Sequence, residues 1–167
     1  YVDDDFGVSL RNDVLWYAPA NRLLPRDQAR LLCLWDELGV PHADPKQLFG
    51  PSLPVLGIEV NVDNMTATLP SDAMDKLVDT IIDFCDLGSN RRRSLRDFQS
   101  LAGYINWALN VFPFLRPGLS SLYAKMANKE NPHAGIYVNQ AVRTELMWLV
   151  HHLRNATGVH FLTAETW

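Results

Sequence analysis

Downstream of Pro70, apolar residues recur every three or four positions, and this spacing restricts the segment to packed amphipathic helices. Ser71 can N-cap a first helix, and Gly88 follows its end. A second helix begins at Ser94, which forms an approximate capping box with Asp97. The apolar stripe of the first helix is Leu77, Val78, Ile81, Ile82 and Cys85, and that of the second is Leu95, Phe98, Leu101, Ala102, Ile105 and Leu109.

Two further helices are expected toward the C-terminus. Pro113 and Pro117 interrupt the second helix, and residues 119–126 resume as a shorter one. Asn139 caps the last helix, and Gly158 is expected to close it. Its inward residues are Val142, Leu146, Leu149, Val150 and Leu153.

The first seventy residues follow a different pattern. Residues 1–10 combine β-formers with an aspartate cluster and Gly7, which predicts a tight hairpin with acids at its tip. Residues 11–25 show no period and are expected to be mostly loop. A helix over residues 26–38, with apolar residues at Leu31, Leu34, Trp35 and Leu38, is followed by Gly39 and then by a loop over 40–52. Residues 53–60 and 65–69 predict a second hairpin. The whole is an α+β chain with a boundary near Pro70.

Charge is distributed unevenly along the chain. Residues 1–87 hold six Lys/Arg against fifteen Asp/Glu, whereas residues 88–127 hold six against one. An acidic half beside a basic segment is typical of a protein that holds cations in one part and faces a polyanion in another. A solvated acidic surface beside a basic turn explains the charges equally well.

Composition excludes several classes of protein. No apolar run is long enough for a membrane helix, so no membrane association is expected. Two cysteines, Cys33 and Cys85, rule out a disulfide scaffold and favour an intracellular setting. The sequence begins without Met, at what we interpret as the end of a strand, so we expect a fragment of a longer chain.

Four segments together resemble one family. Tyr1-Val2-Asp3-Asp4 is similar to the Tyr-x-Asp-Asp signature of reverse transcriptases, and residues 31–39 with Lys46 resemble the helix and loop lysine that follow it there. Residues 55–60 resemble the hairpin called the primer grip. Residues 98–107 have the Gln-x-x-x-Gly-x-x-x-Trp spacing of the first thumb helix, and residues 112–119 are similar to the thumb-to-connection stretch of retroelement enzymes.

The resemblance implies an RNA-directed DNA polymerase that uses two Mg²⁺ ions to add deoxynucleoside triphosphates to a primer 3′-hydroxyl. Asp3 and Asp4 would be metal ligands and catalytic residues, with Asp5 a spectator. Lys46 would be a catalytic residue near the triphosphate, where its ammonium can neutralise charge or give a proton to the leaving pyrophosphate. The implied domains are the end of the palm (1–70), the thumb (71–127) and the start of the connection (128–167), which leads toward a possible ribonuclease H domain. The fingers and the N-terminal palm, with a further aspartate, are not in this sequence. We therefore expect the chain alone to be inactive.

The resemblance also implies contacts to a primer–template duplex of RNA and DNA. Tyr1 would pack below the turn, Val2 would lie near the primer end, and Leu56 and Gly57 would press on its terminal sugar-phosphates. Gln99, Gly103 and Trp107 lie on one helical stripe, with Asn106 beside it, and would face a minor groove. The arginines of the preceding turn would contact phosphates: Arg91, Arg92, Arg93 and Arg96.

Structural explanations remain open for each of these residues. The acids alone would suit an exposed turn, Lys46 a solvated loop, Leu56 and Gly57 a buried strand, and Trp107 a helical core. We interpret His151 and His152 as surface residues, because adjacent helical positions point about 100° apart. A non-enzymatic nucleic-acid-binding remnant of a retroelement is the second candidate function, and a helical interaction module is the third.

Overall fold

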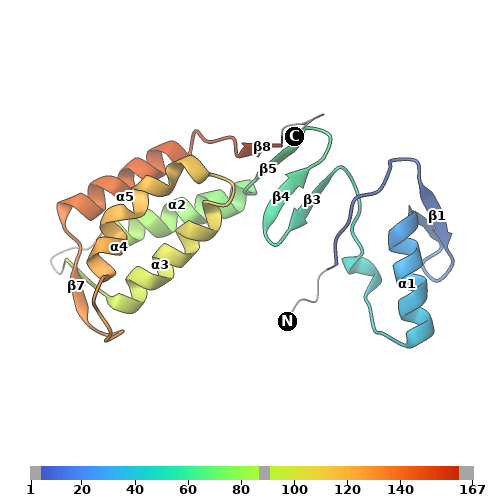
Figure 1. Cartoon of the computed structure of the whole chain (residues 1–167), viewed down its shortest axis with the longest axis horizontal. Helices are drawn as coiled ribbons and strands as arrows, with labels where there is room; N and C mark the ends of the chain where they lie inside the picture. Colours follow the sequence, from blue (N-terminus) through green and yellow to red (C-terminus); the bar gives the residue numbers. More distant parts are fainter. Residues whose placement is uncertain (1–4, 87–90, 162–167) are drawn as a thin grey trace. The chain divides into compact units, whose positions relative to one another are not determined.

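The computed structural model describes residues 5–86 and 91–161 (Figure 1). The chain divides into two compact units, residues 1–55 and 56–167. Helices and short antiparallel strands occur in both units, which confirms the expected α+β class.

The first unit is a hairpin packed on one helix. Its elements are β1 (Val14–Tyr17), β2 (Arg22–Pro25), α1 (Arg26–Leu38), the 3-10 turn η1 (Asp44–Lys46) and β3 (Ser52–Val55). β1 and β2 are antiparallel, with Tyr17 opposite Arg22. The core is small and consists of Tyr17, Leu24, Ala29 and Leu32, all about 1% exposed or less.

Two predictions for this unit were wrong. Residues 5–10 form no strand, and Phe6, Val8 and Leu10 are exposed, so the described part of the first predicted hairpin is absent. Residues 11–25 contain the β1–β2 hairpin instead of a loop. Its turn has Pro19 at the second position, and the Asn21 N–H donates to the Ala18 carbonyl over 3.1 Å. The prolines therefore mark the turn and the end of β2.

Helix α1 matches its predicted bounds, and Gly39 ends it in the left-handed conformation, with φ 69°. Its buried residues are Ala29 and Leu32, whereas Leu34 and Leu38 are exposed. Of the other two predicted residues, Trp35 packs against the core of the hairpin and Leu31 is half-buried, so the face that packs overlaps the predicted one and is centred on Ala29 and Leu32.

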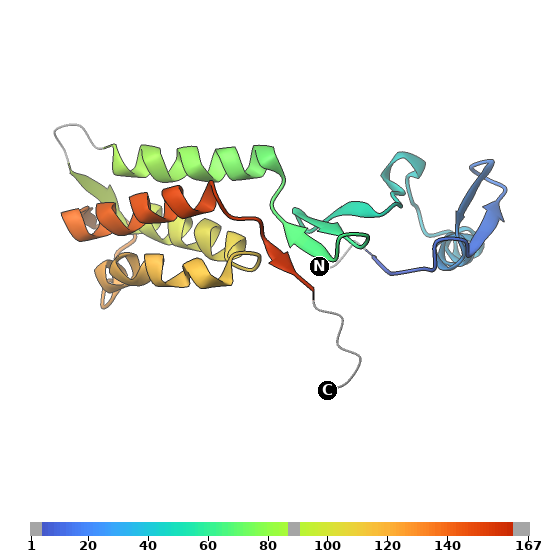
Figure 2. The same ribbon diagram turned by 90° about the horizontal axis from the view of Figure 1, so that it is seen from above.

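The second unit is mainly helical. Its long helices are α2 (Ser71–Cys85), α3 (Leu95–Ala108) and α5 (Gln140–Leu153). Between α3 and α5 lie the 3-10 segment η2 (Pro113–Leu119) and the short helix α4 (Ser120–Met126). α2 packs on α3 and α5, and α4 packs on α3 and α5, as both views of the chain show (Figures 1 and 2). The strands of this unit are β4 (Ile58–Asn61), β5 (Thr66–Thr68), β6 (Arg92–Ser94), β7 (Gly135–Tyr137) and β8 (Val159–His160).

The apolar stripes predicted from sequence form the core of this unit. Phe98, Ile105, Leu146 and Leu149 are fully buried, and Phe84 meets Phe98 edge to face with ring centroids 5.0 Å apart. The predicted stripes of α3 and α5 are buried throughout, and in α2 only Ile82 is partly exposed.

Short strands in this unit join segments that are distant in sequence. β4 pairs with β5 as predicted, and β5 also pairs with β8, with Thr66 opposite His160. β6 pairs with β7, with Arg93 opposite Ile136. The pairings of β6 with β7 and of β5 with β8 were not predicted.

Local details correct three further expectations. The predicted strand over 53–60 is interrupted at Leu56 and Gly57, whose φ angles of 50° and 80° are those of a type I′ turn. Ser71 is the first helical residue of α2, and Pro70 occupies the cap position with no side-chain hydrogen bond. Gly158 lies beyond the end of α5 and directly precedes β8.

The contact boundary lies between residues 55 and 56, so Pro70 lies inside the second unit. The reason is that Ala67 of β5 and Leu69 belong to the same buried cluster as the helices. The division of the chain into palm, thumb and connection stays a prediction.

The capping box at the start of α3 is present. The Asp97 N–H donates to Ser94 Oγ over 3.1 Å, and the Ser94 N–H donates to Asp97 Oδ2 over 2.9 Å. Asn139 likewise caps α5 by accepting a hydrogen bond from the Val142 N–H.

Removal of the Ser94 hydroxyl should destabilise the second unit. We expect Ser94→Ala to lower its free energy of unfolding by about 1 kcal/mol, because the Asp97 N–H loses its acceptor. Urea unfolding followed on signals from α3 measures the change. Ser100→Ala, at an exposed position of the same helix, is the matched control, and equal stability of both variants would contradict the prediction.

Candidate functional site

The candidate metal ligands lie outside the described residues. Asp3 and Asp4, with Tyr1 and Val2, fall in residues 1–4, so their predicted roles in metal and primer binding stay predictions. Within 5–86 and 91–161, no group of three or more His, Cys, Asp or Glu side chains is placed to hold a metal ion. The two Mg²⁺ ions thus depend on the resemblance alone.

The solvent side of α3 contains most of the predicted duplex-binding residues. Gln99, Gly103 and Asn106 are exposed, and Trp107 is half-buried. Gln99, Gly103 and Asn106 lie outside the face that buries Phe98, whereas Trp107 packs partly against the core cluster. Burial of that face therefore turns the predicted stripe toward solvent.

Gly103 occupies an open position on this stripe. A Cβ added to Gly103 would meet no atom within 4 Å, apart from its chain neighbours and the backbone of its own helix. Glycine inside a helix costs about 1 kcal/mol relative to alanine. Packing within the described structure therefore does not account for this glycine, whereas close approach of a ligand would.

The four arginines before and within α3 differ in their surroundings. Arg91, Arg92 and Arg96 are exposed. Arg93 is half-buried, donates to the Asp83 carbonyl over 2.5 Å, and lies over the Phe84 ring at 5.8 Å. It thereby caps the C-terminal end of α2. Arg93 thus has a structural contact, and the phosphate contacts expected of all four arginines stay predictions.

The backbone amides at the start of α3 are already used. The Leu95 and Arg96 N–H groups donate to the Ala134 and Pro132 carbonyls, and the Asp97 N–H donates to Ser94. An anion at this end of the helix would thus meet arginine side chains and not free amides.

The turn Leu56-Gly57 lies against α3. A Cβ on Gly57 would be 3.0 Å from Cζ2 of Trp107, so the indole ring contacts the glycine directly. Leu56 is 69% exposed. The structure thus brings together three of the predicted residues from two separate motifs, and it places Leu56 on an exposed turn and not in a buried strand.

Helix α2 presents charge of the opposite sign. Its exposed acids recur along one side, at Asp72, Asp75, Asp79 and Asp83, followed by Asp86 after its end. On α3, the one acid is Asp97, whose carboxylate is held by Ser94. These hydrogen bonds lower the pKa of Asp97. The exposed charge of α2 is thus mainly acidic, whereas exposed arginines lie at the start of α3.

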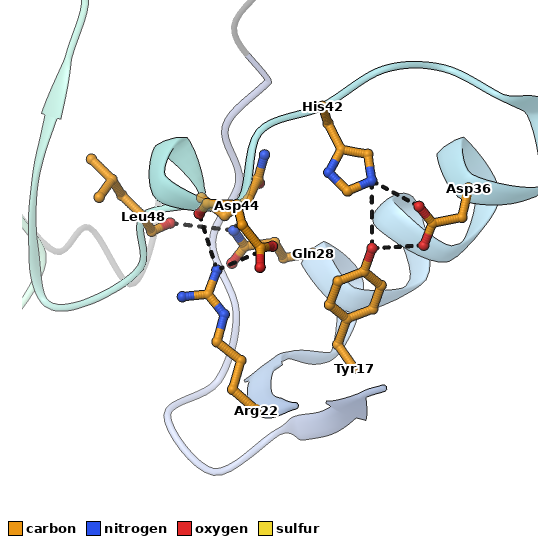
Figure 3. A network of polar contacts seen from close by, with 8 residues as sticks. Tyr17, Arg22, Gln28, Asp36, His42, Asp44 and Leu48 are labelled. Carbon is orange, nitrogen blue, oxygen red and sulfur yellow. Dashed lines mark hydrogen bonds and ion pairs between the residues drawn. The ribbon is translucent and has the colours of Figure 1, made fainter. Parts of the chain in front are cut away.

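In the first unit, a polar network fixes the loop that contains Lys46 (Figure 3). The Tyr17 hydroxyl donates to Asp36 Oδ2 over 2.6 Å, and His42 Nε2 lies 2.9 Å from Asp36 Oδ1. Arg22 donates to the Asp44 carbonyl over 3.3 Å. Lys46 follows at the end of η1 and is exposed.

The same network shifts two pKa values. The hydrogen bond to Asp36, together with burial, raises the pKa of Tyr17 to about 12. The hydrogen bonds from Tyr17 and His42 hold the pKa of Asp36 below its usual range. The tyrosine is therefore neutral and the aspartate charged over the whole physiological range.

Sequence reasoning did not find this network. Tyr17 falls in residues 11–25, which the sequence predicts to be mostly loop, and none of the motifs above includes Asp36 or His42. The nearest signal is the position of His42 just after Gly39 and Pro41, where a short turn can bring a side chain back to the last turn of α1.

The chain matches no protein-family model, and no curated protein matches it. No helix among the described residues combines the length and apolar character needed to cross a membrane.

The Tyr17–Asp36 hydrogen bond should make the stability of the first unit depend on pH. Because the pKa of Asp36 is lowered, its contribution is present above the ordinary carboxyl range and is lost as the pH falls through the lowered value. Because the pKa of Tyr17 is raised, its contribution is lost as the pH rises from about 10 to about 12.

We expect Tyr17→Phe to lower the urea midpoint of α1 at neutral pH and to abolish the alkaline loss. The midpoint, followed on α1 signals across the pH range, measures both effects. Tyr123→Phe, at an exposed position of α4, is the control. An alkaline loss that persists in the Tyr17→Phe variant would contradict this role.

Proposed function

We propose that this chain is part of an RNA-directed DNA polymerase and that the exposed face of α3 binds the primer–template duplex. The observation that supports this most directly is that Gln99 and Gly103, one helical turn apart on α3, are both exposed. The stripe is polar or small, and Gly103 leaves room for close approach.

The dimensions of the face suit a duplex. From Arg96 to Trp107 the helix extends about 16 Å at ~1.5 Å per residue. That length corresponds to roughly five steps of a strand at about 3.4 Å each. Arginines at one end can meet phosphates, and the neutral stripe can meet sugar and base edges. Recognition of this kind depends on shape and not on sequence.

The catalytic part of the proposal depends on the resemblance. Asp3 and Asp4 would hold the Mg²⁺ ions in the complete polypeptide, and these ions would activate the primer hydroxyl and stabilise charge on the triphosphate. Lys46 is exposed on an anchored loop, which is compatible with a charge-neutralising contact to a triphosphate. Template-dependent synthesis by a longer polypeptide containing this chain separates the polymerase from a binding protein without activity.

The arginines should set the salt dependence of duplex binding. We expect the chain to bind a short RNA–DNA hybrid, and we expect joint replacement of Arg91, Arg92 and Arg96 by alanine to weaken binding and reduce the salt slope. The reduction should be roughly two to three units in log–log form, because each phosphate contact releases about one counterion.

Fluorescence anisotropy over a range of salt concentrations measures the slope. Arg154→Ala, at an exposed position at the end of α5, is the control for a general loss of charge. If Arg154→Ala lowered the salt slope as much, per charge removed, as the triple variant does, this result would contradict a phosphate-binding site at the start of α3.

Gly103→Ala should separate stability from binding. Alanine in this open helical position should raise the free energy of unfolding by about 1 kcal/mol. The added methyl group would at the same time hinder close approach of the duplex, so affinity should fall. Urea unfolding and anisotropy measure the two effects, and a variant with unchanged or higher affinity would contradict a role for Gly103 in contact.

A further inference from the structure

Trp107 is half-buried although it lies on the solvent side of α3. It follows Gly103 by one helical turn, and Gly103 is exposed. Gly57 of the turn Leu56-Gly57 contacts the edge of the indole, in addition to the core residues on which Trp107 packs. Trp107 packs against the buried cluster of the helices, and a segment about fifty residues away in the sequence adds a second contact to its ring.

Two contacts occupy the Trp107 ring. Gly57 approaches so closely that a Cβ would lie 3.0 Å from Cζ2 and 3.6 Å from Cη2. Tyr104 stacks on the indole with an interplanar angle of 16° and a centroid separation of 5.9 Å. Both contacts use ring surface that a stacked sugar would otherwise need.

Leu56 depends on support from its surroundings. It has a φ of 50°, in the left-handed region that a leucine rarely adopts, and its side chain is 69% exposed. Such conformations persist where neighbouring contacts fix them, and they are frequent at ligand contacts. The contact of Gly57 with Trp107 supplies that fixation next to Leu56.

We infer that Trp107 is a positioning residue that fixes the Leu56-Gly57 turn on α3. Leu56 and the stripe Gln99–Gly103 then form one continuous surface for the duplex. This inference deepens the proposed function and rests on it. It assigns Trp107 a role different from the direct sugar contact expected from the sequence.

The contact can be tested in the full chain without nucleic acid. The Gly57 α-proton that takes the place of a Cβ should be shifted by the indole ring current and should show a nuclear Overhauser effect to Hζ2 of Trp107. Trp107→Ala should abolish the shift, whereas Trp148→Ala, at a 39% exposed tryptophan on α5, should leave it intact. An unshifted Gly57 α-proton in the unaltered protein would overturn the inference.

Binding of a short RNA–DNA hybrid tests the role of the contact. We expect Trp107→Ala to reduce affinity about tenfold while the salt slope is unchanged, because the arginines remain. Gly57→Ala should reduce affinity similarly while Trp107 is retained, because alanine is strained at a φ of 80° and crowds the indole.

The possible outcomes distinguish the positioning role of Trp107 from duplex binding by α3. Lower affinity of Trp107→Ala with full affinity of Gly57→Ala would mean that Trp107 contacts the duplex itself, and would overturn the inference while leaving the proposed function intact. Absence of hybrid binding by the unaltered chain would overturn the proposed function and the shared surface. The ring-current shift would still report whether Trp107 holds the turn.

Discussion

Burial of one face of α3 is the interaction on which the rest of the second unit depends. Phe98 and Ile105 are completely buried, and the Phe84–Phe98 contact ties α3 to α2. Once this face is fixed, helical geometry leaves the side with Gln99 and Gly103 no partner in the core. Core packing alone therefore leaves the candidate interface on α3 exposed to solvent.

The two ends of this face are set by different contacts, polar at the start of α3 and apolar at its end. At the start of α3, the capping box and the β6–β7 pairing fix the backbone, and Arg93 is committed to α2. At the other end, the Leu56-Gly57 turn contacts Trp107. Charge is distributed unevenly over the unit, because the exposed acids lie on α2 and the exposed arginines lie at the start of α3. A duplex can approach one side of the unit with less repulsion than the other.

The sequence predicted what depends on local pattern. The cores of α3 and α5 followed from apolar spacing, and Ser94 and Asn139 were correct caps because capping involves residues three positions apart. What depends on distant pairing was missed: β8 joins β5 across more than ninety residues, and Trp107 meets a turn fifty residues earlier. α1 has apolar residues on more than one face, so its spacing identified only part of the face that packs on the β1–β2 hairpin.

The central claim is that the solvent face of α3 binds a nucleic-acid duplex. Chemical-shift mapping of the full chain with a short RNA–DNA hybrid tests it most directly. We expect amide shifts to concentrate at residues 96–107 and at the turn 56–57, while the amides on the acidic side of α2 are unchanged. Shifts that cluster on α2 or α5 and spare α3 would contradict it, as would a spectrum unchanged by the hybrid at low salt.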